Sequence, residues 1–200
     1  MNIVSRVQNI LLKPKEEWVA IKGETTTIPQ LFMSYAAILA AIPAVAQFIG
    51  YALIGVHVPI IGFVRVSIPA ALVQAVVGYV VGLAVLYGFG FIINALAPNF
   101  SSTQNLTNAV KIAVYSCTPM WVAGILFIVP MLGVLVMLAS LYGLYIMYLG
   151  FDTPLMETPK DKVAAYCIVS IVVAIVLAVV VFAILSAVVF RPLGGGFRLY

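Results

Sequence analysis

Residues 163–190 read VAAYCIVSIVVAIVLAVVVFAILSAVVF and contain no charged side chain. A helix that crosses a membrane needs about 20 predominantly apolar residues, and this stretch is longer than that. Four more apolar blocks precede it, and in none of them do polar residues recur at the spacing of a helix with one solvated face. The outer surfaces of these helices must therefore face hydrocarbon. The sequence predicts an all-α, multi-pass bundle of five transmembrane helices.

Composition supports this prediction. Hydrophobic residues make up 64% of the 200 residues and charged residues only 8%, whereas soluble domains carry about 25% charged residues. The net charge of +4 does not indicate nucleic-acid binding, because the basic residues are scattered between the apolar blocks and are not gathered on one face. A water-soluble domain and a nucleic-acid-binding protein are both excluded.

The chain divides at its polar stretches. We expect spans at about 29–54, 67–97, 109–128, 133–150 and 163–190, with polar loops at 98–108 and 152–162. Residues 129–133 must form a tight turn, because a single helix over 109–150 would be about twice as long as a membrane needs. The second span exceeds the hydrocarbon thickness, so we expect it to tilt, project or kink, and Gly88 and Gly90 are the expected kink sites.

Residues 1–28 are predicted to form a cytoplasmic, interfacial amphipathic segment, followed by the five-helix domain at 29–190 and a glycine-rich external tail at 191–200. The apolar stripe of its first helix is expected to lie on the membrane and comprises Ile3, Val7, Ile10 and Leu11. Pro14 suits the first position of a second helix, whose first turn contains Glu16 and Glu17. Trp18 is expected to anchor this helix at headgroup level.

Lysine and arginine predict the orientation through the positive-inside rule. Seven basic residues lie on the side of the amino terminus and three on the opposite side: Arg6, Lys13, Lys15, Lys22, Lys111, Lys160 and Lys162 against Arg65, Arg191 and Arg198. The amino terminus is therefore expected in the cytoplasm and the carboxyl terminus outside.

No pattern of catalytic, cofactor-binding or metal-ligating residues is found, so the protein is expected to be neither an enzyme nor a cofactor protein. His57 is the only histidine, and Cys117 and Cys167 are interpreted as small apolar residues within spans. All six acidic residues lie outside the spans, and Lys111 lies near a span end from which its side chain can reach the interface. Coupling of transport to a carboxylate at mid-membrane depth is therefore not expected.

Neutral polar residues within the spans leave two alternatives open. They line a path for an uncharged solute, or they form hydrogen bonds between helices; the residues are Gln47, Gln74, Asn94, Tyr79 and Tyr87. Gly78-x-x-x-Gly82 is interpreted as a helix-packing motif, within the monomer or between two copies, with a chance match as the third alternative.

The end of the fourth span and the following loop form a candidate surface for lipids or partners. Together with Trp18, this surface comprises Tyr142, Tyr145, Tyr148, Asp152, Lys160, Asp161 and Lys162. The tyrosines recur every third residue and form a slowly drifting stripe on a helix. Lys160 and Lys162 flank Asp161 as they would in a site for an anionic headgroup. The alternative is an aromatic belt that fixes the depth of the helix, next to ordinary positive-inside lysines.

This same region carries a resemblance to a known family. Its sequence contains Leu141-Tyr142-Gly143-Leu144-Tyr145, Tyr148-Leu149-Gly150, Met156 and Thr158-Pro159-Lys160-Asp161-Lys162, followed by Tyr166. With Pro14, Trp18 and Tyr115-x-x-x-Pro119, the sequence resembles the prokaryotic branch of the Yip1 family over nearly its whole length.

The resemblance implies a cytoplasmic amino terminus, an external carboxyl terminus and no known enzymatic activity. Eukaryotic relatives act in vesicle trafficking and associate with prenylated Rab-type GTPases and with one another. This chain lacks their long cytosolic amino-terminal region and their Asp-Leu-Tyr-Gly-Pro motif. The resemblance therefore does not imply that this chain binds GTPases. The resulting prediction is a non-enzymatic protein of the cell membrane that organises lipids or other membrane proteins, with itself as a further possible partner. A small-solute transporter or channel is the alternative.

Overall fold

The computed structural model describes residues 2–58, 62–153, 155–187 and 197–199. The elements in chain order are α1 (Ile3–Leu12), α2 (Pro14–Lys22), α3 (Ile28–Leu31), η1 (Phe32–Ala36), α4 (Ala37–Ile49), η2 (Gly50–Ile54), β1 (Val56–Val58), β2 (Gly62–Val66), α5 (Ile68–Leu96), η3 (Ala97–Phe100), α6 (Leu106–Ser116), α7 (Thr118–Ala123), η4 (Gly124–Ile128), η5 (Pro130–Leu132), α8 (Gly133–Asp152), α9 (Val163–Leu185) and β3 (Phe197–Leu199).

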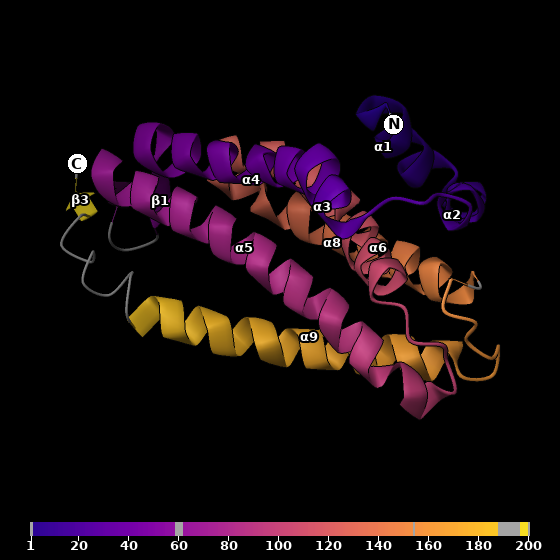
Figure 1. Ribbon diagram of the computed structural model, residues 1–200. Coiled ribbons are helices and arrows are strands. Elements are labelled where there is room, and N and C mark those ends of the chain that lie inside the picture. Colours follow the sequence, from indigo (N-terminus) through magenta and orange to yellow (C-terminus); the bar gives the residue numbers. More distant parts are fainter. Residues whose placement is uncertain (1, 59–61, 154, 188–196, 200) are drawn as a thin grey trace.

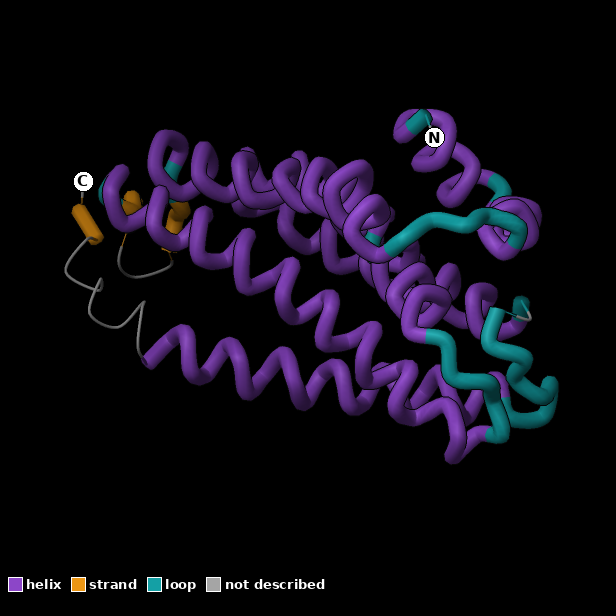
Figure 2. Tube along the Cα trace, viewed as in Figure 1, coloured by secondary structure: helices purple, strands orange, loops and turns teal. Residues whose placement is uncertain are grey.

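Five helical stretches of the described residues are long and apolar enough to cross a membrane: Ile28–Ile54, Ile68–Phe100, Leu106–Ile128, Pro130–Asp152 and Val163–Leu185. They form one elongated bundle (Figure 1), which confirms the predicted all-α, five-span architecture. We call the end with α1, α2 and the α8–α9 loop the amino-terminal end, and the end with the three strands the hairpin end (Figure 2).

The core of the bundle is α6, whose eight residues from Ala109 to Ser116 are all buried. Two neighbouring helices approach it closely through glycine. A Cβ at Gly90 of α5 would lie 2.6 Å from Val110 Cγ2, and a Cβ at Gly143 of α8 would lie 2.5 Å from the Ser116 carbonyl oxygen. Larger side chains at these two positions would force the helices apart.

The third span is not one continuous helix, because α6 ends at Ser116 and α7 begins at Thr118. Pro119 has no amide hydrogen and therefore cannot donate to the carbonyl of Tyr115, four residues earlier. The hydroxyl of Thr118 donates to this carbonyl instead, at 2.7 Å. The break thus leaves no unpaired acceptor at Tyr115 in the apolar interior.

Two boundaries differ from the sequence predictions. The α-helix of α5 continues through the expected kink sites Gly88 and Gly90 to Leu96. The loop predicted at 98–108 is shorter, because η3 extends the second span and α6 already begins at Leu106. Asn105 caps α6, and its Oδ1 accepts from the Asn108 amide at 3.0 Å. The predicted tight turn around Pro130 is present, and Val129 separates η4 at the end of the third span from η5 at the start of the fourth.

Three short strands at the hairpin end were not predicted. They form an antiparallel sheet in the order β1-β2-β3, in which Val56 pairs with Val64 and Arg65 pairs with Arg198. The glycine-rich tail predicted at 191–200 lies outside the described residues, except for β3.

The last span, α9, is buried only in its first third. Its buried residues are Val163, Tyr166, Cys167 and Ser170, while Ile175, Val176 and Val179 farther along are more than half exposed. Figure 1 shows α9 close to α5 at the amino-terminal end and diverging from it towards the hairpin end. The bundle is therefore tightly packed around the start of α9 and open between α9 and its neighbours towards the hairpin end.

Candidate functional site

The amino-terminal segment, which comprises α1, α2 and residues 23–27, folds back onto the bundle. Asn2 caps α1, and its Oδ1 accepts from the Val4 amide at 3.0 Å. The predicted start of α2 at Pro14 is confirmed. The expectation that the apolar stripe of α1 faces lipid is wrong for Ile10, which is 2% exposed and belongs to the core. Ile3 and Val7 pack against this core as well.

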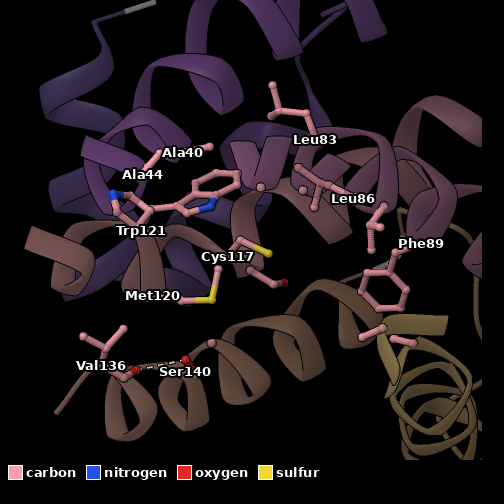
Figure 3. A pocket seen from close by; sticks show the side chains of 18 of the residues that line it. Ala40, Ala44, Leu83, Leu86, Phe89, Cys117, Met120, Trp121, Val136 and Ser140 are labelled. Carbon is pink, nitrogen blue, oxygen red and sulfur yellow. Dashed lines mark hydrogen bonds between the residues drawn. The ribbon is translucent and has the colours of Figure 1, made fainter. Parts of the chain in front are cut away.

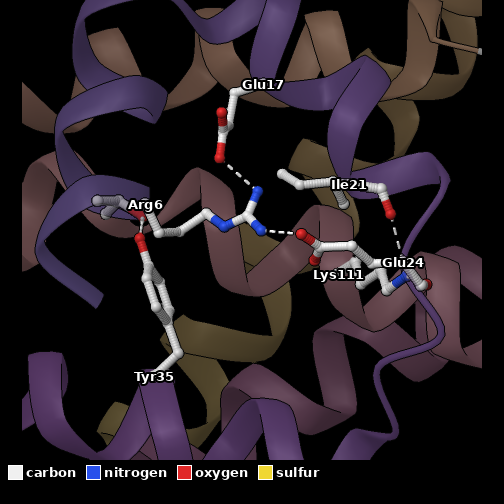
Figure 4. Close-up of polar contacts among 7 residues, drawn as sticks. Arg6, Glu17, Ile21, Glu24, Tyr35 and Lys111 are labelled. Carbon is white, nitrogen blue, oxygen red and sulfur yellow. Dashed lines mark hydrogen bonds and ion pairs between the residues drawn. The ribbon is translucent and has the colours of Figure 1, made fainter. Parts of the chain in front are cut away.

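A buried ion-pair cluster holds the segment together. The guanidinium of Arg6 pairs with the carboxylates of Glu17 and Glu24 (Figure 4). Its Cζ also lies 5.6 Å from the centre of the Tyr115 ring in α6. Arg6 is only 5% exposed, and a charge buried to this degree is stable only when it is paired. The cluster therefore links α1, α2 and the core helix.

Lys111 completes the cluster and corrects a prediction. We expected its side chain to reach the membrane interface, but the residue is 2% exposed. Its ammonium donates to the carbonyl oxygens of Ile21 at 3.2 Å and Glu24 at 2.6 Å (Figure 4). Ile21 is in the last turn of α2 and Glu24 follows it, where a helix leaves acceptors unpaired and attracts positive charge. Lys111 thus binds the carboxyl end of α2 to α6.

Trp18 is not an interface anchor, because it is 1% exposed and lies inside the protein. Its indole N–H donates to the Ile146 carbonyl of α8 at 3.0 Å. The ring lies directly against Gly150, where a Cβ would be 2.8 Å from Cζ2 of the indole. The glycine at 150 is required here by the close approach of the indole and α8. Trp18 therefore docks α2 onto the fourth span.

The three tyrosines at the end of the fourth span have different environments. Tyr142 donates its hydroxyl to the Leu11 carbonyl at 2.8 Å and so contacts the amino-terminal segment. Tyr145 and Tyr148 are 45% and 40% exposed. Of the three, these two present substantial ring surface to lipid or a partner.

The charged residues of the following loop have partners within the chain. Lys160 binds the Asp152 carboxylate at 2.6 Å, and Lys162 donates to the Ser101 hydroxyl at 2.7 Å. Asp161 is exposed. The two lysines thus contact different parts of the protein, and the headgroup site proposed for this loop stays a prediction.

A polar cleft of about 690 Å³ opens beside the ion-pair cluster. Its lining combines Arg6, Glu17 and Glu24 with hydroxyl and amide side chains that were not singled out in the sequence: Asn2, Ser5, Asn9, Thr25, Thr26 and Gln30. This cleft and the exposed tyrosines are two surfaces at the amino-terminal end that could contact a partner.

A second and larger cavity, which we call the groove, lies at membrane depth among α4, α5, α7, α8 and α9. It has a volume of about 810 Å³, and none of its described lining residues is charged. Trp121, Met120 and Leu86 surround it in Figure 3. Met137, Leu144 and Ile175 line it and are each more than 40% exposed. The groove is therefore open to the hydrocarbon between the spans.

Gly78 and Gly82 line this groove and do not pack against another helix. A Cβ at either position would meet no atom within 4 Å. The interpretation of Gly78-x-x-x-Gly82 as a packing motif within the monomer is therefore wrong. The glycines that allow close approach are elsewhere, at Gly50, Gly90, Gly124, Gly143 and Gly150.

Several polar groups on the groove are satisfied within the protein. Ser140 donates to the Val136 carbonyl at 2.9 Å, and Tyr79 donates to the Ala37 carbonyl of α4 at 3.0 Å. For Tyr79 the interhelical hydrogen bond is thus the correct alternative. Gln47 and Gln74 also line the groove. Among the residues that the structure describes, no three His, Cys, Asp or Glu side chains are grouped as metal ligands.

Comparison with known proteins gives the family. The Yip1 domain matches residues 9–183, which cover the amino-terminal segment from the end of α1 onward and all of the five spans except the last two residues of the fifth. The chain belongs to the Yip1 family. This finding confirms the resemblance carried by residues 141–166 and by Pro14, Trp18 and Tyr115-x-x-x-Pro119. In this Yip1-family protein, Trp18 docks on Gly150 and Pro119 breaks the third span.

Inner membrane protein YohC of Escherichia coli K12 is 27% identical over 153 residues, which cover 75% of this chain and 78% of that protein. The protein of the same name from E. coli O6:H1 matches to the same extent. Together with the five apolar helices, this similarity identifies a multi-pass protein of the cell membrane. No solved structure matches the chain.

Proposed function

We propose that this Yip1-family protein is a non-enzymatic organiser of lipids or other membrane proteins, with its amino-terminal end in the cytoplasm. The proposal rests on one observation: buried polar side chains bind other parts of the same chain. Arg6, Lys111 and Trp18 all bind other parts of the same chain. They hold the amino-terminal segment as a fixed platform on the bundle. A protein that presents such a platform is suited to holding neighbours in place.

The proposed orientation rests on the distribution of basic residues described above, because lysine and arginine are favoured on the cytoplasmic side. Single cysteines at Thr25 and Phe197, in a chain with Cys117→Ala and Cys167→Ala, are expected to react with an impermeant thiol reagent from opposite faces of sealed vesicles. Reaction of both positions from one face would contradict the orientation and the odd number of spans.

Transport of a small uncharged solute is the second candidate, and the amides of Gln47 and Gln74 in the groove favour it. The uncharged lining and the lateral opening to hydrocarbon favour lipid instead. A path for water-soluble molecules needs polar groups along its length, whereas the groove is lined mainly by Ala, Gly, Leu, Val and Met side chains.

One experiment separates the two candidates. The full chain is extracted into native-membrane nanodiscs for mass spectrometry of its bound lipids, and is also reconstituted into vesicles for uptake of glycerol. An organiser retains a reproducible set of phospholipids or a membrane protein and leaves glycerol entry equal to that of protein-free vesicles. Faster glycerol entry that requires the protein would overturn the proposal in favour of transport.

A further inference from the structure

The groove has a length and a position that point to a specific ligand. Its lining on α5 runs from Gln74 to Phe89, and this length of helix, about 15 residues, corresponds to about 22 Å. One leaflet contributes about 15 Å to the roughly 30 Å of bilayer hydrocarbon. The groove is therefore longer than one leaflet is thick, so an acyl chain that lies in it can extend past the midplane.

The two ends of the groove differ in polarity. Gln47 lies seven residues before the end of η2, and Gln74 lies six residues after the start of α5. Both amides are thus about 10 Å inside the hairpin end of their helices. The other end is lined by Phe89, Met147 and Ile171. Phe89 lies seven residues before the end of α5 and Met147 five residues before the end of α8, so the apolar end of the groove lies beyond the middle of both helices. A polar end towards the hairpin end and an apolar end beyond the middle of the spans match an acyl chain with its ester group.

The walls of the groove leave space that the protein itself does not fill. Gly78 and Gly82 face it, and a Cβ at either position would have no atom within 4 Å. The last span contributes Ile171, Ala174 and Leu177 to the wall of the groove, but Ile175 beside them is 57% exposed, so the groove stays open along α9. The hydroxyls of Ser140 and Tyr79 already donate to carbonyls of the chain. The occupant therefore needs to supply apolar volume and few hydrogen-bonding groups.

We propose that the groove holds one acyl chain of a phospholipid from the leaflet at the hairpin end, with its ester group beside Gln47 and Gln74. This inference deepens the proposed function and rests on it, because it names the lipid part that the organiser holds. The occupant enters sideways between α8 and α9, past the exposed side chains of Leu144 and Ile175.

Trp121 provides a direct readout, because it lines the groove and is only 5% exposed. The other tryptophan, Trp18, is 1% exposed and contacts α8 from the amino-terminal segment. Bromine atoms on an acyl chain quench tryptophan fluorescence at short range. In bilayers of phosphatidylcholine brominated near the middle of one chain, fluorescence of the full-length protein is expected to fall, and the Trp121→Phe variant is expected to lose this quenching.

The blocking variant is Gly82→Phe, because its ring would occupy the empty groove, and Val80→Phe is the matched control. Val80 is 57% exposed, is on the same helix and does not line the groove. Gly82→Phe should lower the apparent affinity for the brominated lipid roughly tenfold, which is about 1.4 kcal/mol, and Val80→Phe should leave it unchanged. Gly78→Leu tests the same space with a smaller side chain and replaces Gly82→Phe if that variant does not fold.

Absence of Trp121 quenching in the unmodified protein, or equal quenching in the blocked and unblocked proteins, would overturn the inference. If the unquenched protein also has the mass of a dimer, a second copy covers the groove. Phospholipid that still co-purifies without quenching would leave the proposed function intact and refute only this site. Protein-dependent glycerol entry would instead refute the proposed function, whatever the quenching shows.

Discussion

The amino-terminal end of the bundle and the groove beside α9 use glycine in opposite ways. At the amino-terminal end a large side chain fills the space beside a glycine, as Trp18 does at Gly150. Towards the hairpin end the space beside Gly78 and Gly82 is empty, and α9 diverges from the bundle. The same residue type therefore creates a tight contact in one region and an open groove in the other. The first region fixes the fold, and the second is available to a ligand.

The largest effect is expected from breaking the ion-pair cluster. Arg6→Ala leaves Glu17 and Glu24 without their cation in a buried site, and breaking a buried pair in this way costs about 3–5 kcal/mol. The free energy of unfolding in detergent should fall by this amount, measured by chemical denaturation. Lys13→Ala is the control, because Lys13 is 66% exposed and 4.0 Å from Glu16. Equal stability of the two variants would show that the amino-terminal end is not the fixed region.

The next effect concerns the tightly packed glycine. Gly150→Ala places a methyl group close to the Trp18 ring, at 2.8 Å from Cζ2. Overpacking of this kind costs about 1–3 kcal/mol, and the indole must also move away from the Ile146 carbonyl. Thermal unfolding should shift to lower temperature, and the Trp18 emission should move to longer wavelength. An unchanged midpoint would mean that the indole does not depend on this contact.

The matched substitution in the groove should raise the stability of the protein, whereas Gly150→Ala lowers it. Gly82→Ala adds a methyl group to open space, and alanine is more favourable than glycine in a helix interior by about 0.5–1 kcal/mol. The midpoint of thermal unfolding should rise slightly. A loss of stability as large as that of Gly150→Ala would erase the proposed contrast between the two regions.

The smallest effect on stability is expected for Lys160→Ala combined with Lys162→Ala. Lys160 is 74% exposed in its pair with Asp152, and exposed ion pairs contribute less than about 1 kcal/mol. The informative measurement is the amount of anionic lipid or partner protein that co-purifies, which should fall if this loop grips an anionic group. Tyr148→Ala is the comparison, and as part of an aromatic belt it should chiefly lower stability. If the double variant retains all of the bound lipid and partner protein, the lysines of this loop serve only to orient the protein in the membrane.

The sequence predicts what depends on neighbouring residues in the chain. Five apolar blocks, the turn around Pro130 and the start of α2 at Pro14 were all predicted, because hydrophobicity and helix capping are local properties. The roles of Trp18 and Lys111 were predicted incorrectly, because both depend on how α2 docks on later spans. Trp18 and its acceptor at Ile146 are 128 residues apart. No pattern within either segment indicates this pairing.

One signal in the sequence pointed towards the correct answer. Lys111 is a charged residue inside a span, which is costly unless a partner lies nearby. The candidates on the same side of the membrane include Glu17 and Glu24 in the amino-terminal segment. Glu24 and Ile21 do lie at Lys111, although it is their carbonyl oxygens that accept from the ammonium. The groove had no such signal, because empty space beside Gly78 depends on where α8 and α9 lie.

The contact between Trp18 and Ile146 also sets an order of events during biosynthesis. The amino-terminal segment leaves the ribosome before its binding site on α8, which is made 128 residues later. At about 5–20 residues per second, the delay is on the order of 10 s. During this time the apolar face of α1 and the indole of α2 have no site to occupy. The amino-terminal segment is thus synthesised before all five spans but docks only after the fourth span has been made.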